Sequence, residues 1–260
     1  MSKSSRPKTA LEACGLSDIG PVRRTNEDSF VADEELQLFV VADGMGGHSA
    51  GEIASSLAVE TIVGFIRRSE DGEFSWPYGV DAHLSFCANR LRTAIHLANR
   101  RVFRAAEKHD EYTGMGTTVV GALVAGSRLA IAHAGDSRVY VLADGVLTQL
   151  TTDDTWMATV LAGQSNGVVP STHPMRHVLT NVLGARDHAD VHVQERELRG
   201  GDMLLLCSDG LHNVVDDEAI AELMSADTVP ANIVAHLIET ALANGGRDNM
   251  TAVVVRYEGV

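Results

Sequence analysis

The 260-residue sequence is poor in cysteine and proline, with 3 Cys and 6 Pro. Because the three cysteines (Cys14, Cys87 and Cys207) lie far apart and form no C-x-x-C pair, neither a zinc knuckle nor a secreted disulfide scaffold is expected. No apolar run approaches the ~18 residues that a membrane span needs, and no apolar stretch of a signal peptide follows the N-terminus. We therefore expect a cytoplasmic protein in a reducing compartment, with no membrane partner.

Basic residues are also scarce relative to acidic ones. The 21 Lys and Arg against 35 Asp and Glu give a formal net charge of −14. The basic residues are scattered along the sequence, which disfavours nucleic acid as a partner. The acidic excess has two interpretations: it keeps the protein soluble, or some of the carboxylates are gathered to hold cations. The positions of the acids decide between the two.

The chain is organised as a single domain. With 45% hydrophobic residues and no linker, internal repeat or low-complexity run, we expect one domain over residues 14–260, preceded by a flexible tail over residues 1–13. Short β-branched runs predict strands, and longer segments with helical spacing predict helices. The expected strands are 36–42, 117–124, 129–134, 139–142, 203–207 and 251–257, and the expected helices are 50–66, 82–108, 217–224 and 231–243.

The connections between these elements favour antiparallel sheets. The run of strands over 117–150 has short connections, including Asp144-Gly145 as a predicted hairpin turn. We expect an α/β or α+β sandwich in which helices cover the sheets. The polar segment over 151–176 is different, and we predict a long irregular flap there.

Four acids stand where apolar strands begin or end, namely Asp43, Asp136, Asp209 and Asp248. If the last strand runs opposite to the other three, these carboxylates meet at one rim of the sheets. An Asp-Gly pair, as at Asp43 and Asp209, is usually only a turn. Here, however, the strand is apolar up to the acid, and a strand buried on both faces delivers its last side chain into the protein.

Gathered carboxylates require counter-ions, because each uncompensated buried ion costs several kcal/mol. The donors are oxygen atoms without a His or Cys cluster, so the site should prefer Mg²⁺ or Mn²⁺ to Zn²⁺. Glu27 and Asp28 add two acids, and Arg23 adds a nearby cation. Two metals that share a carboxylate can activate a water and neutralise charge on a phosphate ester, while an arginine holds the phosphate oxygens.

A family resemblance rests on six motifs. They are Arg23-x-x-Asn26-Glu27-Asp28, Val41-Ala42-Asp43-Gly44-Met45-Gly46-Gly47-His48, Gly114-Met115-Gly116-Thr117-Thr118, Gly135-Asp136-Ser137-Arg138, Leu206-Cys207-Ser208-Asp209-Gly210 and Gly246-Arg247-Asp248-Asn249-Met250-Thr251. Together they resemble the metal-dependent serine/threonine protein phosphatases of the PP2C (PPM) type, bacterial branch, from about residue 16 to 256. This resemblance implies an α+β fold: a four-layer αββα sandwich of two mostly antiparallel sheets flanked by helices.

The resemblance also implies a two-metal centre that takes Mn²⁺ or Mg²⁺. One metal would be held by Asp43, Asp209 and Asp248. The second would be held by Glu27, Asp43 and the backbone carbonyl of Gly44, so that Asp43 bridges the two ions.

Further roles follow from the same resemblance. Asp136, with Asp209, would offer a site for a third, weaker ion. Asp28 would hydrogen-bond water molecules around the metals, and Arg23 would bind the substrate phosphate. The implied activity is hydrolysis of phosphoserine and phosphothreonine in proteins, reversing the action of a cognate kinase in a bacterium, by a monomeric enzyme.

Three neighbouring residues stand around this centre. Asn249 would support Asp248. Met45 stands where eukaryotic members carry a histidine proposed as general acid, and a thioether cannot donate a proton, so no general acid is assigned. His48 is interpreted as a supporting residue of the glycine-rich loop.

Alternatives remain open at this stage. A pseudophosphatase would bind a phosphoprotein without turnover, although it would have no need for so many costly carboxylates. A small-molecule phosphohydrolase could use the same metals. A cysteine-based phosphatase is not supported, because none of the three cysteines begins a C-x5-R motif.

Overall fold

The computed structural model describes residues 10–47, 50–70, 76–163, 175 and 177–259, which form two antiparallel sheets. One sheet contains β1 (Ala10–Asp18), β11 (Met250–Gly259), β10 (Met203–Cys207), β7 (Arg138–Ala143) and β8 (Val146–Gln149), in that spatial order. The other contains β2 (Asp28–Asp33), β3 (Leu38–Met45), β5 (Val119–Ala125), β6 (Arg128–Ala134) and β9 (His192–Glu197), with β4 (Gly116–Thr117) paired to β3.

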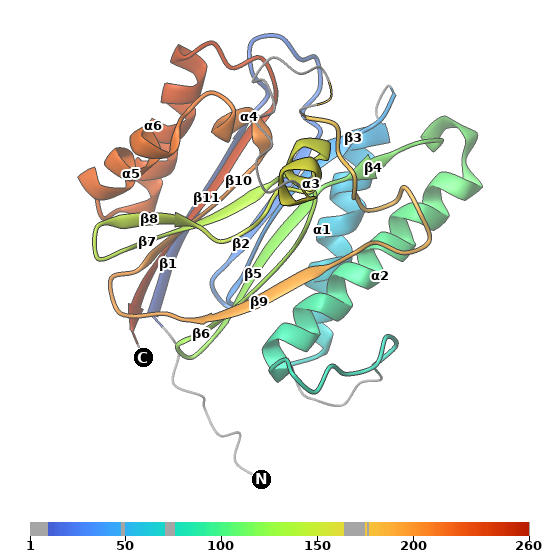
Figure 1. Ribbon diagram of the computed structural model, residues 1–260, viewed down its shortest axis with the longest axis horizontal. Coiled ribbons are helices and arrows are strands. Elements are labelled where there is room, and N and C mark those ends of the chain that lie inside the picture. Colours follow the sequence, from blue (N-terminus) through green and yellow to red (C-terminus); the bar gives the residue numbers. More distant parts are fainter. Residues whose placement is uncertain (1–9, 48–49, 71–75, 164–174, 176, 260) are drawn as a thin grey trace.

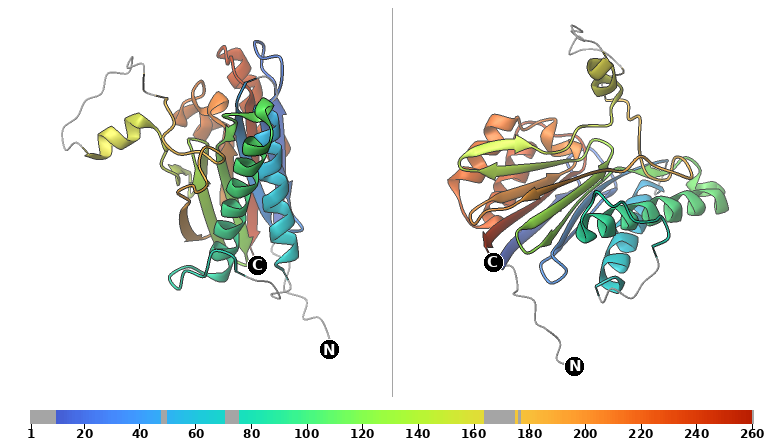
Figure 2. Two further views of the ribbon diagram at one scale, coloured as in Figure 1. Left: turned by 90° about the vertical axis from the view of Figure 1, so that its right-hand side faces the viewer. Right: turned by 60° about the horizontal axis from the view of Figure 1, so that its bottom comes forward.

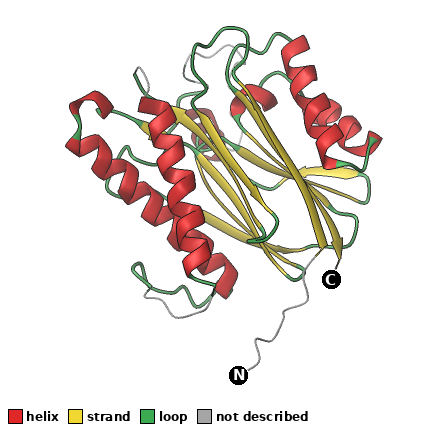
Figure 3. Cartoon of the chain, turned by 180° about the vertical axis from the view of Figure 1, so that it is seen from behind, coloured by secondary structure: helices red, strands yellow, loops and turns green. Residues whose placement is uncertain are grey.

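Helices cover the outer face of each sheet (Figure 3). The β2–β9 sheet packs against α1 (Ala50–Arg68) and α2 (Phe86–Lys108), and the β1–β8 sheet packs against α4 (Asp209–His212), α5 (Asp217–Ala226) and α6 (Pro230–Ala243). The short η1 (Asp110–Tyr112) follows α2. None of the described helices combines the length and apolarity needed to cross a bilayer.

Strand β3 shows why the two sheets stack. Leu38 and Val40 belong to the core beneath α1 and α2, whereas Phe39 and Val41 belong to the core between the sheets, because side chains alternate across a strand. Each of these four side chains has 0% exposure, and burial of such a side chain contributes about 1.5–3 kcal/mol. A strand covered on both faces is therefore apolar throughout. The predicted α+β, four-layer αββα sandwich is confirmed.

The N-terminal boundary differs from the prediction. Strand β1 begins at Ala10 and pairs with β11, so residues 10–13 belong to a sheet and not to the expected tail. The expected helix over 82–108 begins later, at Phe86, because the Ser85 hydroxyl accepts a hydrogen bond from the amide of Ala88 and caps the helix.

The segment predicted to be an irregular flap contains a helix, α3 (Trp156–Gly163), which stands clear of the sandwich (Figure 2). The described ends of this segment are tied together: Trp156 donates a backbone hydrogen bond to Val178, and Thr155 pairs with Leu179 in an isolated bridge. Residues 164–174 and 176 lie outside the described residues. The hairpin turn at Asp144-Gly145 is confirmed, since both residues have positive φ angles, of 51° and 77°.

Topology brings the predicted acids to one rim, at the upper end of the sheets in Figure 1. Strand β10 ends just before Asp209, and its antiparallel neighbour β11 begins just after Asp248. In the other sheet, Asp28 at the start of β2 pairs with Asp43 near the end of β3. The last strand, β11, was expected to run opposite to the strands that lead to the other acids. This is confirmed for β10, the strand that leads to Asp209.

Candidate active site

A pocket of about 210 Å³ lies at this rim. It is lined by Arg23, Glu27, Asp43, Gly44, Met45, Gly46, Thr118, Asp136, His177, Leu179, Asp209, Asp248 and Asn249. All the predicted site residues line it except two. Asp28 does not line the pocket but pairs with Asp43 across strands β2 and β3, and His48 lies outside the described residues.

Asp43 is fixed through its backbone. Its amide donates to the Thr118 hydroxyl (3.1 Å), and its carbonyl accepts from the Thr118 amide and the Thr117 hydroxyl, both at 2.9 Å. Loss of solvation and the neighbouring carboxylates of Asp28 and Asp209 raise the pKa of Asp43 well above its ordinary value. The fold therefore holds an acid in a place where its charge is unfavourable without a cation.

Asp28 is the most enclosed of the acids on the β2–β3 pair. Its Oδ2 accepts hydrogen bonds from the Ser208 hydroxyl (2.8 Å) and the Thr251 hydroxyl (2.6 Å). Its Oδ1 is buried and has no partner among the described residues. Burial raises the pKa of Asp28 to about 6 even though both hydroxyls favour the charged form. The unpartnered oxygen is therefore a buried acceptor that is available for a hydrogen bond.

Glu27 rests on the first turn of α1. A Cβ on Gly51 would overlap Glu27 Oε1, and a Cβ on Gly44 would overlap the carbonyl of Gly51, so three stretches of backbone meet where only glycine fits. The Gly44 amide donates to the Glu27 carbonyl at 3.1 Å. Glu27 Oε1 is buried without a hydrogen-bond partner in the described structure, and burial raises its pKa.

Asp248 and Arg23 form an ion pair across the rim, with Arg23 Nη2 at 2.6 Å from Asp248 Oδ2. Both side chains are about half exposed, at 48% and 42%. The predicted metal ligand and the predicted phosphate ligand thus contact each other. Asp209, at the start of α4, accepts a hydrogen bond from Asn213 Nδ2 at 3.1 Å. Burial, with a further contribution from Asp248, raises the pKa of Asp209.

Asn249 joins the start of β11 to the loop that carries Arg23 and Glu27. Its Oδ1 accepts from the Glu27 amide (2.8 Å), and its Nδ2 donates to the carbonyls of Ile19 (2.9 Å) and Thr25 (3.1 Å). The side chain is 4% exposed, so these bonds are protected from water. Asn249 therefore sets the position of residues that line the pocket from both sides.

Asp136 closes the pocket on the side of the flap. It is 5% exposed, and burial followed by repulsion from Asp209 raises its pKa to about 7. Its carbonyl contacts His212 Nε2 at 3.0 Å. Since a carbonyl only accepts, Nε2 carries the hydrogen, and the buried Nδ1 has no partner among the described residues. Burial lowers the pKa of His212 to about 4, so this imidazole is neutral.

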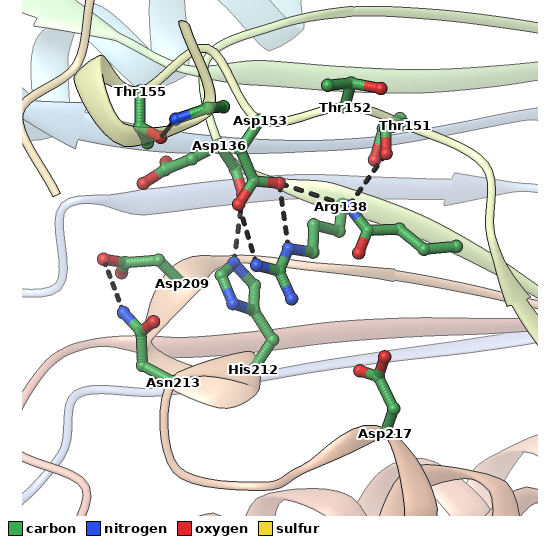
Figure 4. A network of polar contacts seen from close by, with 12 residues as sticks. Asp136, Arg138, Thr151, Thr152, Asp153, Thr155, Asp209, His212, Asn213 and Asp217 are labelled. Carbon is green, nitrogen blue, oxygen red and sulfur yellow. Dashed lines mark hydrogen bonds and ion pairs between the residues drawn. The ribbon is translucent and has the colours of Figure 1, made fainter. Parts of the chain in front are cut away.

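A polar network behind Asp136 anchors the start of the flap (Figure 4). Arg138 holds Asp153 with two hydrogen bonds, from Nε at 2.9 Å and from Nη2 at 2.7 Å. Arg138 Nη1 also donates to the Tyr140 hydroxyl, which donates to Asp217 on α5. This bidentate, half-buried pair links β7 to the flap, so the flap starts from a fixed point.

His177 was not predicted from the sequence. It reaches the pocket from the far end of the flap, together with Leu179, and its charge would lower the pKa of Asp209. Among the described residues that line this pocket it is the only imidazole. No motif surrounds it, and only the functional tendency of long loops could have pointed to it.

The pocket fits divalent cations by its chemistry. It offers carboxylate and carbonyl oxygens, and Glu27 Oε1 is buried there without a hydrogen-bond partner among the described residues. Burial raises the pKa values of Glu27, Asp43, Asp136 and Asp209. As the side chains stand, no group of three or more described His, Cys, Asp or Glu residues is arranged to hold a metal ion directly. Mg²⁺ keeps several of its waters, so acids that line a shared pocket can hold it partly through water, and Mn²⁺ favours the same oxygen donors.

The chain belongs to the protein phosphatase 2C family, whose model matches residues 23–243. The serine/threonine protein phosphatase PstP of Mycobacterium tuberculosis is 38% identical over 251 residues, covering 96% of this chain and 46% of that protein. The chain thus spans about half the length of this relative. The serine/threonine phosphatase stp of Listeria monocytogenes is 32% identical over 252 residues, covering 93% of this chain and 94% of the relative.

Solved structures agree with this assignment. The phosphatase Stp1 of Staphylococcus aureus superposes with a TM-score of 0.83 at 33% identity, covering 100% of both chains. The catalytic domain of PstP in complex with two manganese ions superposes with a TM-score of 0.78 at 37% identity, covering 95% of this chain and 97% of that one.

Proposed function

We propose that this protein hydrolyses phosphoserine and phosphothreonine in proteins, using Mn²⁺ or Mg²⁺. The observation that carries the proposal is the gathering of Glu27, Asp43, Asp136, Asp209 and Asp248 around one pocket with an arginine at its edge. Such a set of carboxylates is tolerable only with cations among them. An arginine beside two cations suits a phosphate dianion.

The metal ligands are those that the family pattern assigns. Asp43, Asp209 and Asp248 would hold one cation, and Glu27, Asp43 and the Gly44 carbonyl would hold the second. Asp136 and Asp209 would hold a third, weaker one. When bound, the cations supply an activated water nucleophile and neutralise the charge that develops on the phosphoryl group.

Arg23 and Asp28 act beside this centre. Arg23, which pairs with Asp248 at 2.6 Å in this structure, would hold two phosphate oxygens through its guanidinium. The unpartnered Oδ1 of Asp28 would accept a hydrogen bond from a water and orient it. Asn249 keeps the loop that carries Arg23 at a fixed distance from the acids.

His177 supplies the proton for the leaving alkoxide. Met45 lines the pocket but its thioether has no proton to donate, whereas an imidazole is suited to acid catalysis near neutral pH. His177, which directly follows the flap, and Met45 of β3 line the same pocket. This end of the flap would therefore contribute a chemical group as well as a wall.

The dimensions of the pocket favour a phosphorylated side chain over a free nucleotide. Its volume of about 210 Å³ lies below the ~300–1,000 Å³ typical of small-molecule sites. A phosphothreonine that projects from a protein needs room only for its phosphate. The substrates are therefore products of a Ser/Thr kinase.

The test compares a phosphothreonine peptide with nucleoside monophosphates, each with Mn²⁺ and with a chelator. We expect phosphate release from the peptide with Mn²⁺ only. Preference for the nucleotides would indicate a small-molecule phosphohydrolase. Binding of the phosphopeptide without turnover at saturating Mn²⁺ would indicate a pseudophosphatase.

A further inference from the structure

Five basic residues cluster on one face of the molecule, four of them within residues 100–108 and the fifth, Arg68, at the end of α1. On the outer face of the α1–α2 layer, a groove of about 450 Å³ is lined by Thr61, Arg68, Leu97, Arg100, Arg101, Arg104, Ala105, Lys108 and His109. Five of the 21 Lys and Arg residues of this acidic chain thus line one groove. The sequence-based view that the basic residues are dispersed is wrong for this face.

The cations of the groove are largely uncompensated. In the part of the chain that the structure describes, only Arg101 among the five has a carboxylate partner, Glu60 at 3.1 Å. Arg100, Arg104 and Lys108 follow one another at intervals of four residues, so they form a row along one side of α2. Like charges at this spacing destabilise a helix, whereas a cation in the last turn, such as Lys108, is favoured by the helix dipole. The stability of α2 therefore accounts for Lys108 and gives no reason for Arg100 and Arg104.

The lining of the groove combines apolar and charged side chains. Leu97 and Ala105 line it together with the basic residues, and the helices α1 and α2 that supply the lining pack side by side (Figure 3). Such a lining suits a narrow chain that carries both carboxylates or phosphates and apolar side chains. A larger anionic partner, such as duplex DNA or an anionic membrane surface, would extend beyond the groove. It would then be repelled by the rest of the protein, whose net charge is −14.

We propose that this groove docks an acidic segment of a partner protein. The proposal rests on the proposed function in one respect: the partner is the phosphorylated substrate, held by a segment remote from its phosphate. The groove then raises the local concentration of the phosphate at the metal pocket.

The geometry allows one partner to occupy both sites. Ala50 at the start of α1 lies against Gly46 of the metal pocket, where a Cβ on Gly46 would come within 2.9 Å of the Ala50 Cβ. Thr61, in the groove, lies about three helical turns further along α1, roughly 16 Å away at 1.5 Å per residue. About five extended residues cover that distance.

The first experiment measures binding alone. A short fluorescein-labelled peptide rich in Glu and Leu is titrated with wild-type protein, with R100E/R104E and with the matched control R196E/R199E. The control makes the same change in net charge around β9. We expect R100E/R104E to weaken binding about tenfold and the control to change it by less than about twofold. Equal affinity in all three proteins would overturn the proposal, as would duplex DNA or anionic vesicles binding more tightly than the peptide.

The second experiment separates this proposal from the proposed function. A phosphothreonine peptide is assayed with and without an acidic extension on a flexible linker, beside p-nitrophenyl phosphate. R100E/R104E should raise KM for the extended peptide only, and leave kcat and the other two substrates unchanged. If the ratio of KM for the extended peptide to KM for the unextended peptide is the same in R100E/R104E as in the wild-type protein, the docking role is overturned. Absence of turnover in every protein, with peptide binding still lost in R100E/R104E, would instead reject the proposed function and leave the docking site standing. Thermal melting confirms that both variants fold.

Discussion

At the scale of the residue, the site is a set of acids held where their charges are unfavourable. Asp43 and Asp28 face each other across two paired strands, and Asp136 has a pKa of about 7 because it is buried near Asp209. The backbone of Asp43 is locked by three hydrogen bonds, so it cannot move to relieve the repulsion. In the proposed function, the cations that these acids would bind offset this cost.

The substitution Asp43→Asn tests that interpretation, because it should lower the rate of hydrolysis and raise the melting temperature of the metal-free protein. Loss of the bridging carboxylate should lower Mn²⁺-dependent hydrolysis by at least about 10²-fold, the scale for removal of one key electrostatic contact. The same change removes one charge from a repelling cluster, so the melting temperature of the metal-free protein should rise. Kinetics and thermal melting in chelator measure the two effects. A wild-type rate would exclude Asp43 from the centre.

His177→Ala should affect substrates according to their leaving groups. Hydrolysis of a phosphothreonine peptide, whose alkoxide leaves poorly without a proton, should fall by about 10²-fold or more. Hydrolysis of p-nitrophenyl phosphate, whose phenolate leaves unaided, should change little. Equal losses for both substrates would assign His177 a structural role and reject it as the acid.

At the scale of the element, helix α1 is coupled to the site through its first turn. Gly51→Ala would place a Cβ against Glu27 Oε1 and the Gly44 backbone, so we expect a loss of about 1–3 kcal/mol in unfolding free energy and weaker Mn²⁺ binding.

The matched control for that change is Gly64→Ala in the same helix. Its Cβ would meet only the flexible end of Arg68, at 3.2 Å, and alanine favours the helix by up to about 1 kcal/mol. Denaturant unfolding and calorimetric titration with Mn²⁺ measure both variants. If Gly51→Ala behaves like Gly64→Ala, the proposed support of Glu27 by α1 is wrong.

The strands that the sequence predicted are those that are buried on both faces. Strand β10 and the apolar part of β3 were predicted because both faces are covered, whereas β9 (His192–Glu197) was missed because it is a polar edge strand. Asp43, Asp136, Asp209 and Asp248 were predicted because they stand where apolar strands begin or end. His177 could not be predicted, because its place at the pocket depends on which segments the fold brings together, whereas four of the five cations of the α2 groove already lie close together within residues 100–108.

At the scale of the whole molecule, a net charge of −14 is divided unevenly. Acids converge at the rim of the two sheets, and cations converge on the outer layer of helices. The rim has a consequence for global stability, because proton uptake by its acids is linked to folding.

The metal-free protein should become less stable as pH rises from about 4 to 7. The pKa of Asp28 is raised to about 6 and that of Asp136 to about 7, so between their ordinary values and these values the folded state binds more protons than the unfolded state. Unfolding free energy therefore falls with pH across that window and levels off above it. The melting temperature should drop by at least about 2–4 °C, the shift that 1 kcal/mol produces in a domain of this size.

Saturating Mg²⁺ should remove most of this pH dependence above pH 6, since the bound cations replace the protons. Asp136→Asn should reduce the slope without metal. Melting curves in chelator that are flat across pH 4–7, or that rise with pH, would contradict the repulsion among the acids.

The most direct test of the central claim is a Mn²⁺ titration of the metal-stripped protein, with phosphate release from a phosphothreonine peptide as the readout. The account predicts no release in chelator, recovery that saturates as Mn²⁺ is added, and no recovery in Asp43→Asn at the same concentrations. Undiminished release by the stripped wild-type protein in chelator would contradict it.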